Sequence, residues 1–260
     1  MTQAVTLIAQ DTVTAKNREI MPYPNASSTL IVIPAFNEAK NIGVVIDEIN
    51  VELPGIPVLV INDGSSDATA QIAKEHGAKV ISLPYNSGYG VALQTGFLYA
   101  VQNKYSIVVQ MDGDRQHDAK SIQLLLQEIQ NEGTDIVIGS RFLGTCQYKT
   151  TFARTVGIFI FRKLTSFLIG QKITDPTSGF QAVKGGAIKF MASDFYPPDY
   201  PDADFIIMLH RFGYKIREIP VNMRANQDNK SMHHGHQTIY YIFKMFLSIM
   251  ATILRQKPEK

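Results

Sequence analysis

The sequence lacks the features that mark secreted, disulfide-bonded and membrane-spanning proteins. It contains a single cysteine, Cys146, among 260 residues, which excludes an internal disulfide and is typical of a reducing compartment. Residues 1–20 contain neither a basic segment nor a long apolar one, so we expect no secretory signal. No uncharged apolar run reaches the about 18 residues that a membrane-spanning helix requires.

The chain also lacks a strong charge of either sign and the glycine-rich loops of common nucleotide sites. Its 25 Lys and Arg against 23 Asp and Glu give a formal charge of +2, which is too small to predict nucleic-acid binding. Neither GxGxxG nor a Walker-type loop occurs, so the sequence predicts neither a dinucleotide fingerprint nor a P-loop.

Between residues 29 and 140 the chain alternates short apolar runs with segments of helical periodicity. We expect buried strands at 29–34, 57–63, 78–84, 105–114 and 135–140, and helices at 37–50, 66–77, 90–103 and 119–133. Asn37 is the expected N-cap of the first helix. Ser66 or Asp67 is expected to cap the second helix, and Gly77 to end it. This alternation predicts an α/β fold with a mostly parallel, Rossmann-like sheet covered by helices on both faces.

After residue 145 the pattern changes, but it does not indicate a separate domain. We expect an apolar helix at 152–170, a turn-rich loop at 174–185 leading into a short strand, a helix at 202–213 and a strand at 214–223. Gly213 is the expected end of the helix before that strand. A further apolar helix is expected at 239–255. We infer that the second half completes the same fold and supplies the side for a second substrate.

Acidic side chains follow three of the expected strands, at Glu38, Asp63 and Asp112. In open α/β sheets, ligands bind outside the carboxyl ends of the strands, so these side chains are expected at one edge. Asp63 is suited to hydrogen bonding a base or a ribose. A simple capped turn is the alternative interpretation of its segment, "DGSSD".

The segment "QMDGDRQHD", residues 110–118, gathers oxygen ligands after the fourth expected strand. Asp112 and Asp114 are two residues apart, so both carboxylates can reach one hard cation, and Gln116 adds a neutral oxygen. Mg²⁺ and Mn²⁺ prefer such ligands and bind together with substrate phosphates. A solvated turn is the alternative, because Asp-Gly-Asp also occurs in ordinary loops.

Six motifs in a fixed order identify a family. They are "VIPAFNEAKNI", "VINDGSSDAT", "NSGYGVALQTG", "QMDGDRQH", "GSRF" and "DPTSGFQAVKG". In this order they resemble the family 2 glycosyltransferases, which have the GT-A fold. They look most like the branch of dolichol-phosphate-mannose synthase, whose members glycosylate polyprenyl phosphates. The resemblance covers residues 29–232.

The resemblance implies a nucleotide pocket, a metal site and a reacting centre. The residues that would line the nucleotide pocket are Pro34, Phe36, Glu38 and Asp63; many relatives have Tyr where this chain has Phe36. The ligands of a divalent ion, Mg²⁺ or Mn²⁺, that bridges the donor diphosphate would be Asp112, Asp114 and Gln116. The residues of the loop near the reacting centre would be Asp175 and Ser178.

The resemblance also implies basic residues around the phosphates. Arg141 and Arg154 would face the phosphates and the acceptor. Arg224 and Lys230, in "MRANQDNKS", match the pair that clamps phosphate in that branch, although a solvated basic loop is the alternative. Breaking a sugar–diphosphate bond leaves negative charge on phosphate, which a metal ion together with Arg and Lys stabilises.

The acceptor decides whether a catalytic base is needed. A hydroxyl needs a carboxylate to take its proton, whereas a phosphate oxygen is already anionic. Asp202 and Asp204 lie where hydroxyl-using relatives often keep an acidic base. Both could instead be acids that cap the following helix.

From the resemblance we expect an inverting, metal-dependent transferase. It would move a hexose from a UDP- or GDP-linked sugar to a polyprenyl phosphate of the undecaprenyl type, for cell-envelope polysaccharide or glycan synthesis. The "NSGYG" variant favours UDP. Two alternatives stay open: transfer to a hydroxyl of a growing glycan, and a non-catalytic nucleotide-sugar-binding subunit.

Two apolar segments, 152–170 and 239–255, suit the membrane surface at which a polyprenyl phosphate lies. We expect a location on the cytoplasmic face of the cell membrane, reached directly or through a small membrane-protein partner, since the chain stops where many relatives continue into spanning helices. Packing on the core or in a homo-oligomer is the alternative. We divide the chain into a flexible arm over 1–28, a GT-A domain over 29–235 and an amphipathic C-terminal helix over 236–260.

Overall fold

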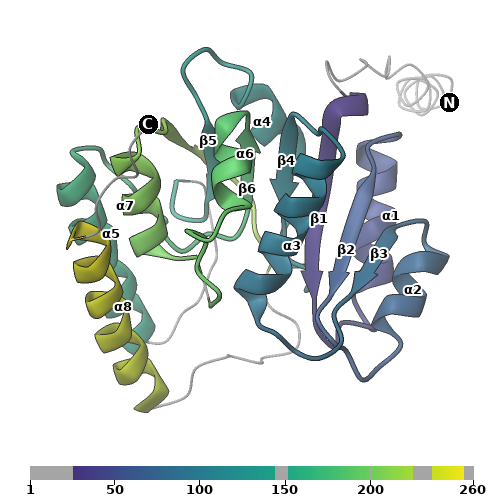
Figure 1. Ribbon diagram of the computed structural model, residues 1–260, viewed down its shortest axis with the longest axis horizontal. Coiled ribbons are helices and arrows are strands. Elements are labelled where there is room, and N and C mark those ends of the chain that lie inside the picture. Colours follow the sequence, from purple (N-terminus) through teal and green to yellow (C-terminus); the bar gives the residue numbers. More distant parts are fainter. Residues whose placement is uncertain (1–25, 144–151, 200, 225–235, 255–260) are drawn as a thin grey trace, which may run out of the picture.

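The computed structural model describes residues 26–143, 152–199, 201–224 and 236–254. These residues form one sheet with helices on both faces, which confirms the expected α/β class (Figure 1). Of the expected N-terminal arm, residues 1–25 lie outside the described residues. The described chain opens on a single 3-10 turn, Ala26–Ser28, that leads directly into the first strand.

The sheet has seven strands in the order β3-β2-β1-β4-β6-β5-β7. Their bounds are β1 Thr29–Ala35, β2 Val58–Asn62, β3 Lys79–Ser82, β4 Ile107–Gln110, β5 Ile136–Ser140, β6 Gln181–Lys184 and β7 Ile216–Pro220. β6 is antiparallel to its neighbours β4 and β5, and every other pairing of the sheet is parallel. The sheet is therefore mostly parallel, as predicted.

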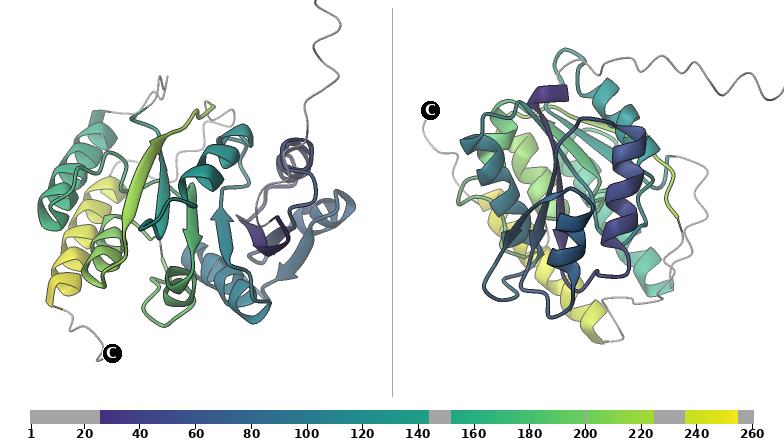
Figure 2. Two further views of the ribbon diagram at one scale, coloured as in Figure 1. Left: turned by 90° about the horizontal axis from the view of Figure 1, so that it is seen from above. Right: turned by 90° about the vertical axis from the view of Figure 1, so that its right-hand side faces the viewer.

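Helices cover the two faces of the sheet unequally (Figures 1 and 2). One face carries α1 Ile42–Glu52, α2 Thr69–Glu75 and α4 Lys120–Glu128. The other face carries α3 Tyr89–Gln102, α6 Gly186–Met191 and α7 Ala203–Arg211. Two long helices, α5 Phe152–Ile169 and α8 His236–Leu254, pack on α7 at the end of the molecule farthest from α1 and α2.

β1 shows why these short apolar runs become central strands. Successive side chains of a strand point to opposite faces, and here Leu30 and Val32 join the cluster under α3, while Ile31 and Ile33 join the cluster under α1. All four are buried. Fully burying a Leu, Ile or Val side chain contributes about 1.5–3 kcal/mol, so a strand with no polar face is held strongly in the middle of the sheet.

The helix ends agree with the turn residues of the sequence, but the caps expected for the first two helices do not. α2 and α7 end just before Gly77 and Gly213, whose φ angles are +88° and +92°, as expected for glycine after a helix. α2 begins at Thr69 with Ala68 in the N-cap position, so the prediction that Ser66 or Asp67 caps it is wrong, although Oδ1 of Asp67 accepts the backbone N–H of Thr69 at 3.0 Å. The prediction that Asn37 caps the first helix is wrong, because α1 begins at Ile42. Asn37 instead adopts a left-handed φ of +56° and its side-chain oxygen accepts the backbone N–H of Ser66 at 2.9 Å.

The apolar helices of the second half form as expected, at α5 and α8. None of the helices in the described part of the chain has the length and hydropathy that crossing a bilayer requires. The short helix α6 was not expected from the sequence, since it spans only residues 186–191. The expected strand over 105–114 ends at Gln110, so the acidic segment after it is a loop.

Candidate active site

Loops that follow β2 and β4 meet at the carboxyl edge of the sheet. Both carboxylate oxygens of Asp63 accept backbone N–H groups from the loop before α3, from Ser87 at 2.7 Å and from Gly88 at 2.9 Å. The next residue, Tyr89, begins α3 and donates its hydroxyl to Oδ1 of Asp112 at 2.8 Å. The structure thus links Asp63 and Asp112 through Tyr89, although β1 lies between the two strands, β2 and β4, that they follow.

Asp112 and Asp114 lie close together on the loop after β4. Burial raises the pKa of Asp112, while the hydrogen bond from Tyr89 and the positive charge of Arg141 lower it. Burial and then repulsion by Asp112 raise the pKa of Asp114. The backbone N–H of Gln116 donates to Oδ1 of Asp114 at 3.0 Å, and its side-chain amide donates to Oδ2. A bound cation would relieve the repulsion between the two carboxylates.

These residues fit a divalent ion that is shared with a substrate. In the part of the chain that the structure describes, no three His, Cys, Asp or Glu side chains are arranged to hold a metal by themselves. Mg²⁺ is usually held by one or two carboxylates and completes its coordination with substrate phosphates and water. Asp112 and Asp114 supply such a pair. Gln116 directs its amide N–H toward Asp114, so its role as a ligand stays a prediction.

The residues expected around the nucleotide have different surroundings. Pro34 is buried in β1. Glu38 accepts the side-chain amide of Asn41 at 2.7 Å, and its backbone N–H donates to Oγ1 of Thr69 at 2.8 Å. Phe36 is 44% exposed. Glu38 therefore helps to hold its own loop, whereas the Phe36 ring is open to a ligand.

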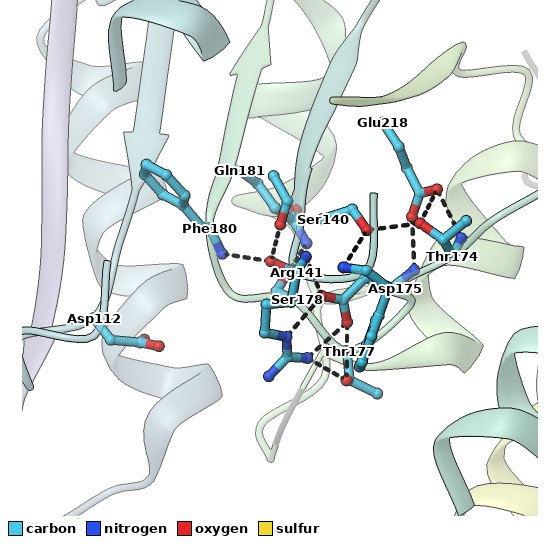
Figure 3. A network of polar contacts seen from close by, with 12 residues as sticks. Asp112, Ser140, Arg141, Thr174, Asp175, Thr177, Ser178, Phe180, Gln181 and Glu218 are labelled. Atoms are coloured by element: carbon cyan, nitrogen blue, oxygen red, sulfur yellow. Dashed lines mark hydrogen bonds and ion pairs between the residues drawn. The ribbon is translucent and has the colours of Figure 1, made fainter. Parts of the chain in front are cut away.

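Arg141 and Asp175 form a buried ion pair beside the acidic loop (Figure 3). Nε and one terminal nitrogen of Arg141 each donate to a different oxygen of Asp175 at 2.6 Å, and the backbone N–H of Arg141 donates to the same carboxylate at 3.0 Å. A further bond runs from the guanidinium to Thr177 at 2.8 Å. Figure 3 shows the Asp112 carboxylate directed toward Arg141. Asp175 thus fixes a guanidinium whose charge acts on Asp112.

Two more residues hold the loop that carries Asp175. Glu218 accepts the backbone N–H of Thr174 at 2.7 Å and that of Asp175 at 2.8 Å, and burial raises the pKa of Glu218. The hydroxyl of Ser178 donates to the carbonyl of Gly139 at 2.7 Å, and Ser178 is buried. Ser178, expected to bind substrate, therefore ties its loop to β5 in this structure.

The structure describes one of the two residues that were expected to clamp phosphate, Arg224. The backbone N–H of Arg224 donates to the carbonyl of Gln116 at 2.8 Å, which places Arg224 beside the acidic loop. Its guanidinium, however, pairs with Glu48 of α1, at 2.7 and 2.8 Å. Lys230 and the side chain of Arg154 lie outside the described residues.

The two candidate bases have different partners. Asp204 is buried and accepts a hydrogen bond from Ser248 of α8, and burial raises its pKa. Asp202 occupies the N-cap position of α7, yet its side chain makes no cap hydrogen bond there. Asp202 lies close enough to Tyr89 to contribute to the raised pKa of that residue, which is due first to burial and to Asp112.

Three residues of the site were present in the motifs but had no role in the predictions. Tyr89 binds Asp112, as described above. The ring of His117 accepts the backbone N–H of Asp112 at Nδ1 and lies stacked on Phe180. A Cβ on Gly179 would lie 2.7 Å from the Tyr89 hydroxyl and 3.4 Å from both oxygens of Asp112. Aromatic and glycine residues in loops have many uses, so the sequence alone did not reveal these contacts.

Comparisons with known proteins agree on one family. The family model described as Glycosyl transferase family 2 matches residues 30–196. An uncharacterized protein of Methanocaldococcus jannaschii is 32% identical over 88% of this chain and 94% of its own length. The polyprenol monophosphomannose synthase of Mycolicibacterium smegmatis is 27% identical over 84% of this chain and 85% of its own. The dolichyl-phosphate hexose transferase of Haloferax volcanii is 30% identical over 75% and 82%.

A solved structure supports the fold. Glucosyl-3-phosphoglycerate synthase from Mycobacterium tuberculosis, crystallised with Mn²⁺, UDP and phosphoglyceric acid, superposes with a TM-score of 0.68. The match covers 88% of this chain and 80% of that one, at 21% sequence identity. The architecture of the described residues is thus that of the GT-A neighbours.

Proposed function

The chain belongs to glycosyl transferase family 2 and is a glycosyltransferase, and on that premise we propose that it transfers a hexose from a nucleoside-diphosphate sugar to a polyprenyl phosphate, with inversion. The observation that carries this proposal is the close carboxylate pair, Asp112 and Asp114, linked through Tyr89 to Asp63 at the sheet edge. Relatives named for polyprenol, undecaprenyl and dolichyl phosphates support a lipid phosphate as acceptor.

In this reaction the chain holds the donor diphosphate and stabilises charge on it. Asp112, Asp114 and Gln116 would hold Mg²⁺ or Mn²⁺, an ion that, when bound, neutralises the charge left on the departing diphosphate. Arg141, fixed by Asp175, adds positive charge near Asp112. The acceptor oxygen then attacks the sugar from the side opposite the diphosphate, which inverts the anomeric carbon.

The side chains around α7 favour a phosphate as acceptor. A phosphate monoester is anionic near neutral pH and needs no base, whereas a hydroxyl does. Asp204 is buried against Ser248 of α8, which favours a structural role for it. Asp202, near Tyr89, is the carboxylate that a hydroxyl acceptor would use.

The Asp202→Asn variant distinguishes the two acceptors. With a polyprenyl phosphate, we expect it to turn over at a rate of the same order as the wild type. With a glycan hydroxyl, loss of a general base would cost about 10²–10⁴-fold in kcat. A loss of that size with the lipid phosphate would contradict the proposed acceptor.

A donor screen tests the proposal as a whole. UDP- and GDP-linked hexoses are incubated with the purified protein, Mg²⁺ or Mn²⁺ and a short polyprenyl phosphate, and lipid-linked product is extracted and quantified. We expect product from a UDP-linked sugar, and none from the Asp112→Ala/Asp114→Ala double variant. Full turnover by that double variant would contradict the metal site. Transfer to glycan hydroxyls alone would contradict the acceptor.

We further propose that α5 and α8 contact the bilayer that contains the acceptor, at the inner face of the cell membrane. Rings of Phe161 and Phe246 lie 5.6 Å apart and bring the two helices side by side. Among the described side chains, the large apolar ones that they expose, here called the α5/α8 face, are Phe159, Phe167, Phe246, Leu247, Met250 and Leu254. Neither helix contains an acidic residue, and Lys163 is exposed between Phe159 and Phe167. Apolar side chains with cationic neighbours suit a surface of anionic lipid headgroups.

A further inference from the structure

The Asp112 carboxylate is held from two sides by side chains that do not themselves belong to the predicted metal site. Tyr89 contacts one of its oxygens and His117 faces the other. We infer that Tyr89 and His117 are positioning residues that fix Asp112 in the orientation in which it binds the metal ion. This inference rests on the proposed function, because it assigns the metal ion to Asp112.

His117 contacts Asp112 through both ring nitrogens. Its Nδ1 lies 3.1 Å from the backbone nitrogen of Asp112. A backbone N–H can only donate, so Nδ1 accepts and the ring proton is on Nε2. Nε2 lies 3.7 Å from Oδ2 of Asp112, which is too long for a hydrogen bond but places the polar edge of the ring beside the carboxylate. One ring therefore binds the main chain of Asp112 and lies next to its side chain.

The orientation of the His117 ring is itself fixed. The ring stacks on Phe180 with centroids 4.7 Å apart and planes inclined by 14°. His117 is 3% exposed, so its ring is enclosed by the protein. Neighbours that orient the ligands of a metal in this way affect its affinity strongly.

Tyr89 reaches Asp112 from a different part of the chain. The two residues before Tyr89, Ser87 and Gly88, donate their backbone N–H groups to the carboxylate of Asp63. The Tyr89 hydroxyl then donates to Oδ1 of Asp112 at 2.8 Å. The position of Asp112 is thus tied to the end of β2, the strand next to β1, as well as to its own loop.

Both contacts are needed because Asp112 and Asp114 repel each other. Without partners, the Asp112 side chain would rotate away from Asp114, and the ion would have to reorder it on binding. Holding the carboxylate in place beforehand removes that cost. Tyr89 and His117 supply this restraint and leave lone pairs of the carboxylate for the ion.

The test is Mn²⁺ binding to the full chain in the presence of UDP, followed by the electron paramagnetic resonance signal of free Mn²⁺. We expect Tyr89→Phe and His117→Phe each to bind Mn²⁺ about ten- to a hundred-fold more weakly than the wild type. Because the defect lies in metal affinity, the Mn²⁺ concentration for half-maximal activity should rise more than kcat at saturating Mn²⁺ falls. His117→Asn, whose amide oxygen can accept the Asp112 N–H in place of Nδ1, should recover part of the affinity.

The control is His210→Phe, a change to a partly exposed histidine at the far end of α7. It should bind Mn²⁺ as the wild type does. Thermal unfolding identifies any variant that has lost its fold. If His117→Phe does not fold, the smaller changes Tyr89→Phe and His117→Asn still test the inference. Unchanged Mn²⁺ affinity in folded Tyr89 and His117 variants would overturn this inference alone. Absence of Mn²⁺ binding by the wild type would overturn the metal site of the proposed function as well.

Discussion

Gly179 determines how closely the loop before β6 can approach the acidic loop. Its φ is not in the left-handed region, so alanine fits the backbone there, but the added methyl would lie 2.7 Å from the Tyr89 hydroxyl. The flexible end of the tyrosine would have to move away from Asp112. Gly179→Ala should therefore weaken Mn²⁺ binding about as much as Tyr89→Phe does.

The Tyr89→Phe/Gly179→Ala double variant makes this prediction sharp. If both changes act by breaking one hydrogen bond, the second change should add little to the first, as in a coupled double-mutant cycle. Mn²⁺ titration of the four proteins measures it. Additive losses would show that the two residues affect the site independently.

Arg224 provides a second prediction at the scale of single residues. Its guanidinium is held by Glu48 and lies 3.6 Å from Asp118, so binding to a phosphate would compete with the Glu48 pair. The pair is partly exposed, with 41% and 28% of the two side chains accessible, and such pairs are worth about 0.2–1 kcal/mol. Glu48→Gln should therefore lower KM for the polyprenyl phosphate about 1.4- to 5-fold.

The control for Glu48→Gln is Glu52→Gln, one turn further along α1. It removes the same charge without releasing Arg224 and should leave KM nearly unchanged. An equal effect of both changes would indicate general electrostatics. No effect of Glu48→Gln, together with normal activity of Arg224→Ala, would remove Arg224 from the phosphate site.

At the scale of single residues, the sequence identified which side chains gather at the site better than it identified what each of them contacts. Asp112 and Asp114 were predicted because two carboxylates two residues apart after a buried strand can both reach one hard cation. Ser178 and Glu38 were assigned to substrate, yet the structure uses both to hold loops. A single sequence gives the type of a side chain and not its partner, and partners in this site come from segments far apart in the chain.

At the scale of elements, α8 is joined to α7 by a buried polar contact. Asp204 of α7 accepts a hydrogen bond from Ser248 of α8, while its other oxygen is buried with no hydrogen-bond partner among the described residues. Burial raises the pKa of Asp204 above the ordinary value of 3.8. The hydrogen bond from Ser248 therefore offsets only part of the cost of burying the Asp204 carboxylate, and the contribution of this contact to stability depends on pH.

The sign of this dependence follows from proton binding. Between its unfolded and folded pKa values Asp204 is protonated more in the folded state, so its contribution to stability falls as the pH rises through that window. Asp204→Asn removes the titration. The difference in unfolding temperature between Asp204→Asn and the wild type should therefore shift in favour of the variant as the pH rises from about 4 to about 7. The expected shift is about 2–4 °C for each kcal/mol of unfolding free energy.

Differential scanning calorimetry at the two pH values measures this change. Asp194→Asn, an exposed residue in the loop after α6, is the matched control and should show no such difference. If the difference between Asp204→Asn and the wild type is the same at both pH values, the carboxyl does not titrate as its burial implies.

Elements with strong patterns were predictable, and those set by tertiary contacts were not. The parallel strands and the long helices follow from apolar runs and from Gly77 and Gly213. The start of α1 was misplaced because Asn37 adopts a left-handed turn that binds Ser66, a contact across two loops. The direction of β6 was not predictable, since periodicity does not tell which neighbour a strand will pair with.

At the scale of the whole molecule, the helices that carry the α5/α8 face pack on α7, which begins beside Asp202 near the active site. Phe167 and Leu254 are 83% and 76% exposed, so replacing them should not disturb the core. The Phe167→Glu/Leu254→Glu variant should float with anionic liposomes far less than the wild type. The variant loses the binding free energy of about 25 cal/mol for each Å² of apolar surface that would be buried in the lipid. The two glutamates also place negative charges against anionic headgroups.

Val51→Glu is the matched control, because Val51 is equally open, at 77% exposure, but lies on α1 at the other end of the molecule. It should float as the wild type does. The Phe167→Glu/Leu254→Glu variant should also lose activity on polyprenyl phosphate in vesicles, but it should keep its activity on a short acceptor in detergent. Equal flotation of all three proteins would contradict membrane contact through α5 and α8.

The reversed strand β6 has one further consequence. It lies between β4 and β5, so the first half of the chain, which carries Asp63 and Asp112, does not form a contiguous sheet by itself. A fragment that ended at Ser140 would leave β4 with a bare edge, which attracts other chains, and would leave β5 without its inner neighbour. The donor half of this enzyme is therefore not expected to fold as an independent unit. A fusion of this half to the acceptor half of another enzyme must include residues 174–184.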